Sequence, residues 1–324
     1  MPATRRLDWI DVVRGSAVLL VILVHVMQRT ELFTGHEFTR LGTASIIVTP
    51  LRLPAMFLLS GLFVPRSLAK GSATHVAGKL RRIAWPYLLW SVLLIVVFDL
   101  DQRLTGFGFG WEVFWRIFYT PIEHLWFLAY LLLYFLLAML MRWIPAPHLL
   151  LAVIAVAALP VEGEWTRFWG HAAFFFAGVV LAGHRDALDR AIGRFWPSLA
   201  LLITAVALST GHATRILVLP EAPWNLPIVL MFIVGLAGVV RPLASTPAFA
   251  PLRYVGVQSI VFYIVHWPVA SLSAQALATT GLDPWPVFGG ALVAALVVPW
   301  AIAWAASRSK PIDAAFVWPV FTRK

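Results

Sequence analysis

Long apolar runs, separated by short polar segments, follow one another along the whole chain. Ten of them approach the roughly 20 residues that an α-helix needs to cross a bilayer; they cover residues 10–27, 45–64, 83–98, 125–141, 149–159, 168–182, 198–208, 226–240, 255–277 and 287–306. Some are short for a perpendicular crossing, so we expect their helices to extend into flanking segments rich in aromatic residues and proline. The pattern predicts an all-α fold, a polytopic membrane helix bundle of about ten transmembrane helices. We expect a single domain over residues 1–324 with no additional soluble domain.

The composition favours a membrane protein and excludes several kinds of chemistry. Hydrophobic residues make up 60% of the chain and charged residues 12%, whereas about a quarter of a soluble domain is charged. The sequence has no cysteine, which excludes a thiolate nucleophile and thiolate ligands for zinc. The formal net charge of +10 does not indicate nucleic-acid binding, because the basic residues lie in short loops and form no continuous patch.

Lysine and arginine are concentrated in alternate loops, which predicts the orientation of the chain. With the N-terminus in the cytoplasm, most basic residues fall in cytoplasmic loops, so we expect both termini to be cytoplasmic. The most basic of these loops contains no acidic residue and five cations, which are Arg66, Lys70, Lys79, Arg81 and Arg82. Such a loop would attract phosphate groups; the alternative is that it only anchors the topology.

The first apolar window carries three ionisable residues in the stretch DVVRGSAVLLVILVH. A charged group inside a membrane span is costly and is therefore a functional candidate. Arg14 and His25 are eleven residues apart, about three helical turns, so they share one face and lie roughly 16 Å apart along the axis. Asp11 precedes Arg14 by three residues, a spacing at which the two side chains can pair.

The positions between Arg14 and His25 on that face are small or apolar, namely Gly15, Val18 and Ile22. This stripe could hold a long, slender substrate between the two polar ends. The alternative is structural: an ion pair orients the start of the helix, and a neighbouring helix satisfies the imidazole.

Polar residues in the second and fourth windows are further candidates for substrate binding. Arg52 precedes Pro54 in an apolar run, and we expect it to face a cavity with Glu37, Glu123 or His124 as its partner. Glu123, His124 and Trp126 open the fourth window, where Glu123 would share a helical face with Phe127, Tyr130 and Tyr134. The alternative is that the aromatic side chains of this face only pack against other helices, with Glu123 at the end of the face that is exposed to water.

The ninth window presents three hydrogen-bonding side chains on one helical face. Ser259, Tyr263 and His266 are spaced i, i+4 and i+7. They could contact substrate or form hydrogen bonds to other helices. We expect His171, at the start of the sixth window, at the membrane interface. The histidine spacing does not predict a metal site, and neither a glycine-rich phosphate loop nor a nucleophile elbow is present.

Five segments in order along the chain resemble landmarks of the acyltransferase-3 family of membrane proteins. DVVRGSAVLLVILVH resembles the first-span signature, in which an arginine, ten residues and a histidine fall on Arg14 and His25, with Asp11 and Gly15 beside the arginine. LPAMFLLSGLF, KLRRIAWPYLLW, HLWFL and SIVFYIVHWP are similar to later segments. The segment after HLWFL, AYLLLYF, lacks the acid that some members carry there. The resemblance covers residues 6–299.

The resemblance implies transfer of an acyl group, with acetyl expected, from cytoplasmic acyl-CoA to a hydroxyl of an extracytoplasmic saccharide or glycolipid. Acetyl-CoA would be a substrate, with no permanently bound cofactor and no metal. Its nucleotide would lie near the five cations of the basic loop, and Arg14, positioned by Asp11, would hold a phosphate or amide carbonyl. His25 would act as general base on the acceptor, or form an acyl-histidine. The expected location is the bacterial inner membrane.

Two other classes of protein fit parts of the pattern. In a transporter or flippase for a polar or anionic solute, the same buried charges would line a pathway; broken helices in matching halves would favour it, and the sequence shows no such pairing. A structural membrane protein would leave the arrangement of Arg14 and His25 unexplained.

Overall fold

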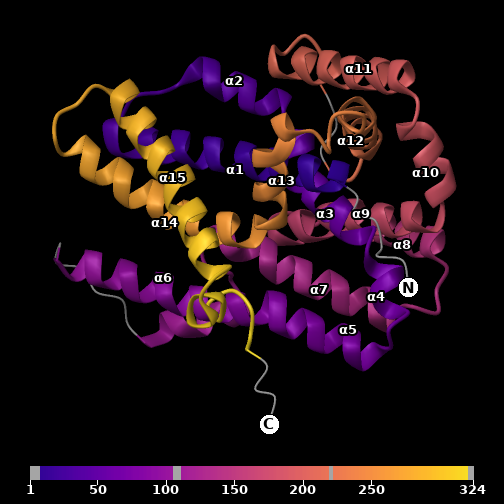
Figure 1. Ribbon diagram of the computed structural model, residues 1–324, viewed down its shortest axis with the longest axis horizontal. Helices are drawn as coiled ribbons and strands as arrows, with labels where there is room; N and C mark the ends of the chain where they lie inside the picture. Colours follow the sequence, from indigo (N-terminus) through magenta and orange to yellow (C-terminus); the bar gives the residue numbers. More distant parts are fainter. Residues whose placement is uncertain (1–7, 105–110, 219–221, 320–324) are drawn as a thin grey trace.

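The computed structural model describes residues 8–104, 111–218 and 222–319, with residues 98–104 and 111–113 described in backbone only. These residues form helices and no strand (Figure 1). In chain order the helices are α1 (Asp8–Thr34), α2 (Thr39–Ile47), η1 (Thr49–Leu51), α3 (Leu53–Gly61), α4 (Val64–Leu68), α5 (Ser72–Lys79), the π-helical turn η2 (Leu80–Ala84), α6 (Trp85–Leu104), η3 (Trp111–Phe118), η4 (Glu123–Leu125), α7 (Trp126–Leu140), α8 (Ala146–Ala157), α9 (Glu164–Gly183), α10 (Arg185–Ile192), α11 (Phe195–Ala213), α12 (Leu226–Val240), η5 (Pro247–Phe249), α13 (Ala250–Val257), α14 (Ser259–Ala278), α15 (Pro284–Ala306) and α16 (Lys310–Asp313).

The all-α prediction is confirmed, and the protein is an integral membrane protein. Within the described residues, seven helices are long and apolar enough to cross a bilayer, and two shorter apolar helices, α8 and α12, accompany them. Each of the ten predicted windows overlaps a helix, and the window 226–240 coincides with α12. The number of ten crossings and the cytoplasmic termini stay predictions.

Two predicted windows are interrupted in the structure. The second window contains the end of α2, the short helix η1 and α3, with Arg52 at the break before α3. The ninth window begins in α13 and continues in α14, with Gln258 at the break between them. Because prolines such as Pro50 and Pro54 lack an amide hydrogen, they favour a helix start and disfavour a continuous helix through the second window.

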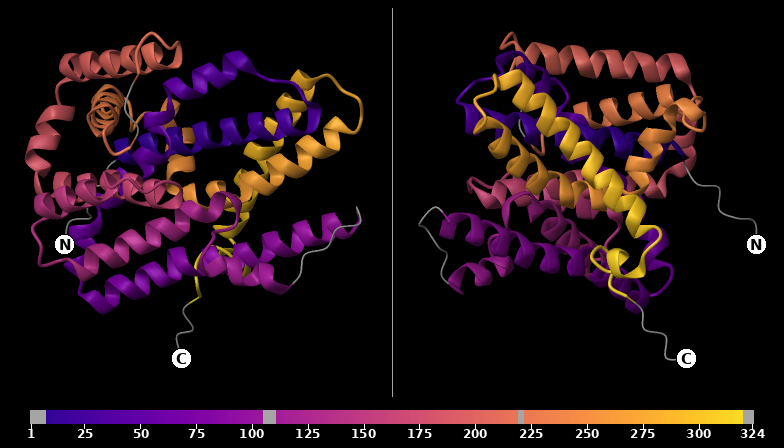
Figure 2. Two further views of the ribbon diagram at one scale, coloured as in Figure 1. Left: turned by 180° about the vertical axis from the view of Figure 1, so that it is seen from behind. Right: turned by 60° about the vertical axis from the view of Figure 1, so that its left-hand side comes forward.

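Helix α1 lies at the centre of the bundle, between α2 and α11 on one side and α5 and α6 on the other (Figure 2). It crosses α13 at two glycines: a Cβ atom on Gly15 would stand 2.0 Å from the carbonyl oxygen of Leu252, and one on Gly256 would stand 1.8 Å from that of Asp11. Small residues of this kind permit close helix contact within membranes.

The predicted substrate stripe along α1 is therefore wrong. Helix α13 covers Gly15, and Val18 and Ile22 are fully buried in the core. No space for a slender substrate follows this stripe, so any route past α1 lies beside other helices.

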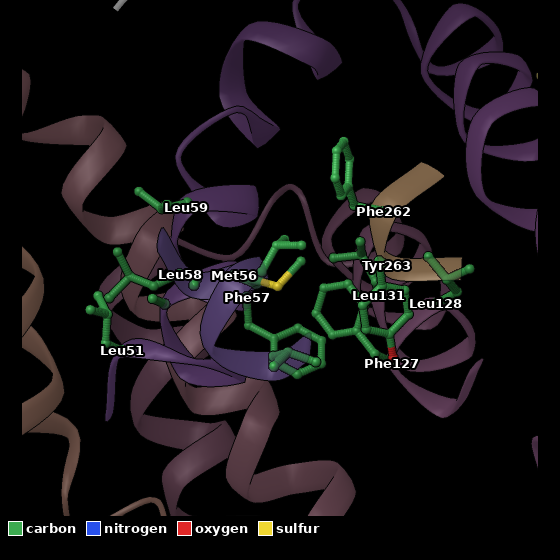
Figure 3. Close-up of a cluster of buried hydrophobic side chains, with 14 of the residues drawn as sticks. Leu51, Met56, Phe57, Leu58, Leu59, Phe127, Leu128, Leu131, Phe262 and Tyr263 are labelled. Carbon is green, nitrogen blue, oxygen red and sulfur yellow. The ribbon is translucent and has the colours of Figure 1, made fainter. Parts of the chain in front are cut away.

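A second close crossing joins α3 to α9. A Cβ atom on Gly61 would stand 2.0 Å from the carbonyl oxygen of Phe175, which fixes the two helices against each other. The crossing positions Met56 and Phe57 of α3 opposite Phe127 of α7, in the buried cluster of Figure 3.

Candidate functional site

Three histidines from distant parts of the chain meet inside the bundle. They are His25 on α1, His124 in η4 and His266 on α14. The Nδ1 atom of His25 lies 2.8 Å from the Nε2 atom of His266, and the planes of the two rings are 3° apart. The centroid of the His124 ring lies 6.4 Å from that of His25 and 5.4 Å from that of His266.

The hydrogen bonds define which nitrogen of each neutral ring carries the proton. His266 Nδ1 lies 2.9 Å from the carbonyl oxygen of Phe262, which can only accept, so His266 Nδ1 is the donor. Its Nε2 atom then accepts, and His25 donates through Nδ1. This leaves a lone pair on the Nε2 atom of His25, as a general base requires.

His124 and Tyr263 join η4 to α14. His124 donates through Nε2 to the carbonyl oxygen of Ile264 at 3.1 Å, and the Tyr263 hydroxyl donates to the carbonyl oxygen of His124. The His124 ring stacks on Trp267, and its Nδ1 atom is buried without a hydrogen-bond partner among the described residues. The structural role that we gave as the alternative for Tyr263 has direct support. In the described part of the chain, no group of histidine and acidic residues is arranged to hold a metal ion.

His25 lines a cavity of about 460 Å³, which we call the His25 cavity. Arg52 lines it too and donates to the Thr49 hydroxyl at 2.7 Å. The cavity agrees with the expectation for Arg52, but its partner is this neighbouring hydroxyl and not Glu37, Glu123 or His124, because the break before α3 turns the side chain back on η1. Polar side chains that we did not predict also line the cavity, among them Gln28, His171 and Asn225.

His171 lines the His25 cavity, and its ring packs against Phe57 and Trp126. Its location at the membrane interface stays a prediction. A polar ring within the otherwise apolar, aromatic sixth window was the available signal, because such a side chain in a span favours a polar cavity or another helix.

Arg14 lines a different cavity of about 530 Å³, which we call the Arg14 cavity. Its guanidinium lies 4.0 Å from the Asp11 carboxylate and 5.7 Å from the centre of the Phe63 ring. Lys79 and Arg82 line the same cavity, together with Ser259 and Tyr263, and its described lining contains no acidic residue. Three cations therefore surround one cavity, which is suited to an anionic group.

The five cations of the predicted phosphate-binding loop do not act as one group. Lys79 and Arg82 line the Arg14 cavity, whereas Arg66 and Lys70 are exposed outside its lining. Arg81 donates to the carbonyl oxygen of Trp318 at 3.1 Å. Residues 66–82 form helices α4, α5 and η2, so successive cations point in different directions.

Aromatic rings of the buried cluster in Figure 3, among them Phe57, Phe127 and Tyr263, connect the walls of the two cavities; we call them the aromatic layer. Phe127 and Tyr263 line the Arg14 cavity. The Phe57 ring packs against Phe127 with 4.6 Å between centroids, and against His171, in the wall of the His25 cavity, with 5.3 Å. Arg14 and His25 thus face separate spaces on opposite sides of this layer.

Glu123 and Trp126 line a third cavity, and the Trp126 ring contacts the His171 ring. We expected Glu123 on the helical face of Phe127 and Tyr134, but α7 begins only at Trp126, and Glu123 lies in η4 with a φ of 43°. This backbone conformation is uncommon for a residue other than glycine.

A model of an acyltransferase domain family, acyltransferase-3, matches residues 7–304 of the chain. Comparisons with curated proteins and with solved structures gave no match.

Proposed function

The chain belongs to the acyltransferase-3 family, and from this premise we propose that it moves an acetyl group from cytoplasmic acetyl-CoA to a hydroxyl of an extracytoplasmic saccharide or glycolipid. The family assignment makes the protein a membrane acyltransferase. The identity of donor and acceptor and the roles of individual residues are our proposal.

The observation that carries the proposal is that His25 lines a cavity while its Nδ1 atom lies 2.8 Å from His266 Nε2, an arrangement in which the neutral ring of His25 keeps its lone pair on Nε2. This nitrogen takes the proton of the acceptor hydroxyl while the hydroxyl oxygen attacks the thioester carbonyl. A carbon–oxygen bond forms, the carbon–sulfur bond breaks, and the proton passes from His25 to the departing thiolate of coenzyme A. During the step His266 Nε2 continues to accept from His25 Nδ1 and stabilises the imidazolium.

The Arg14 cavity supports a site for the anionic end of the donor. Arg14, Lys79 and Arg82 would bind its phosphate groups, since guanidinium and ammonium groups form charge-assisted hydrogen bonds with phosphate. Ser259 and Tyr263 also line this cavity. The pantetheine arm spans a distance on the order of the ~16 Å that separates Arg14 from His25 along α1. The arm would pass the aromatic layer at Phe57 and Phe127.

The test is transfer of label from radioactive acetyl-CoA by purified protein in lipid nanodiscs. The acceptor is the total surface glycan of a strain that lacks the gene. We expect His25→Ala and Arg14→Ala each to remove transfer, while His184→Ala, a matched exposed histidine at the end of α9, leaves it unchanged.

Wild-type transfer rates in folded His25→Ala protein would exclude His25 as general base. Label that remains on wild-type protein after denaturation, and is absent from His25→Ala protein, would indicate an acyl-histidine instead. A transporter would move solute across a membrane without any transfer of label.

A further inference from the structure

The third cavity, of about 510 Å³, is rich in aromatic side chains and also contains charged ones. We call it the aromatic groove. It is formed by the segment after η3, by η4 and by the first turns of α7 and α9. Its aromatic residues are Tyr119, Trp126, Tyr130, Trp165, Phe168 and Trp169, and its charged residues are Glu123, Glu164 and Arg167.

Charged and polar groups of the groove are held in place by one another. Arg167 and Glu164 form an ion pair with 2.8 Å between nitrogen and oxygen, and Tyr130 donates to the other carboxylate oxygen of Glu164. The guanidinium of Arg167 lies over the ring of Trp126, 5.3 Å from its centroid. The groove therefore presents fixed donors and acceptors beside exposed ring faces.

We propose that the aromatic groove binds a neutral pyranose unit of the acceptor saccharide. A pyranose ring has apolar C–H faces, which pack on indole and phenol rings, and hydroxyls at its edge, which bind carboxylates and guanidinium groups. A ligand site with apolar walls and a few placed polar groups is the usual form for a small polar molecule. The groove contains two acidic residues and one arginine, and that arginine is already paired with Glu164. Binding of the donor's phosphate groups in the groove is therefore disfavoured.

The groove adjoins the His25 cavity across one pair of rings. Trp126 lines the groove and His171 lines the His25 cavity, and their ring centroids lie 5.2 Å apart. His171 is further fixed because its Nδ1 atom donates to the carbonyl oxygen of Arg167 at 2.7 Å. A sugar unit in the groove therefore directs a neighbouring unit of the same chain towards His25, so the acceptor contains at least two linked units. This inference rests on the proposed function.

The test compares Trp165→Ala with Trp165→Phe, which keeps an aromatic ring, and with Trp196→Ala, an exposed tryptophan at the start of α11. Transfer of acetyl from acetyl-CoA to the total surface glycan is measured in nanodiscs. Loss of a whole indole ring should remove about 1–1.4 kcal/mol, the upper part of the range for one aromatic contact. We therefore expect Trp165→Ala to raise the KM for glycan about fivefold to tenfold, with kcat and the KM for acetyl-CoA within about twofold of wild type. Trp165→Phe should recover most of the affinity.

A direct measurement separates failure of this inference from failure of the proposed function. Binding of the same glycan fraction, without acetyl-CoA, is followed by the change in tryptophan fluorescence. If the wild type transfers no acetyl but binds glycan, and Trp165→Ala binds glycan at least fivefold more weakly, the proposed reaction is wrong. The aromatic groove is then still supported as a saccharide-binding site. If Trp165→Ala matches Trp196→Ala in both KM and binding, the groove does not hold the acceptor.

Discussion

The hydrogen bond between His25 and His266 provides the sharpest test of the proposed reaction. His266→Phe keeps a ring of similar size in a fully buried position but removes the Nε2 acceptor, 2.8 Å from His25 Nδ1. His25 Nδ1 then becomes a buried donor without its partner, which costs about 1–3 kcal/mol. The ring can avoid this cost by moving its proton to Nε2, and that change removes the lone pair needed for catalysis.

We expect His266→Phe to lower kcat about 10-fold to 100-fold, by analogy with the loss of hydrogen-bond partners that orient metal-ligating histidines. The KM for acetyl-CoA should stay near that of the wild type, because the Arg14 cavity lies beyond the aromatic layer. His266→Gln offers an amide oxygen as acceptor and should retain more activity than His266→Phe. The assay is steady-state transfer of labelled acetyl in nanodiscs.

A control establishes that the protein has folded. Size-exclusion elution of the His266 variants should agree with that of His184→Ala, whose position is exposed. If the kcat of folded His266→Phe protein equals that of the wild type, His266 does not position His25 for catalysis. The reaction then does not depend on the assigned tautomer of His25.

Three further predictions concern stability and donor binding. Gly15→Ala places a methyl group against the α13 backbone and should lower the free energy of unfolding by about 1–3 kcal/mol in detergent. Gly289→Ala, with no atom within 4 Å of the new methyl group, should not lower it. Lys79→Ala should raise the KM for acetyl-CoA severalfold with kcat unchanged, whereas Arg66→Ala, outside the cavity lining, should have no effect; equal effects would contradict the assigned donor site. Tyr263→Phe removes a buried hydrogen bond and should cost about 0.5–1.5 kcal/mol of unfolding free energy, measured by thermal scanning; a kcat loss above tenfold without that cost would favour substrate contact over the structural role.

The positions of the helices follow from the sequence because span-length apolar runs are a local signal. The window 226–240 coincides with α12, and the first window lies wholly within α1. The interruptions at Arg52 and Gln258 were less predictable. Apolar residues continue through both breaks, so hydropathy alone does not distinguish one continuous helix from two shorter ones.

The partners within the site depend on packing between distant segments. His25 and His266 are 241 positions apart, and the helical period of α14 predicts only that His266 shares a face with Ser259 and Tyr263. In the structure His266, the most C-terminal of these three residues, contacts His25, while Ser259 and Tyr263 line the Arg14 cavity. Likewise, the spacing of Arg14 and His25 predicts two polar groups on one helix, but α13 determines that the surface between them is closed.

The aromatic layer formed by Phe57, Phe127 and Tyr263 has a consequence for the energetics of the cell. On the proposed donor route, the pantetheine arm has to pass these rings, whose centroids lie 4.6 Å (Phe57 to Phe127) and 5.1 Å (Phe127 to Tyr263) apart, so the rings must separate to admit it. Without donor, rings packed in this way would restrict a continuous chain of water between the two cavities. The same side chains would then limit proton leakage across the membrane between turnovers.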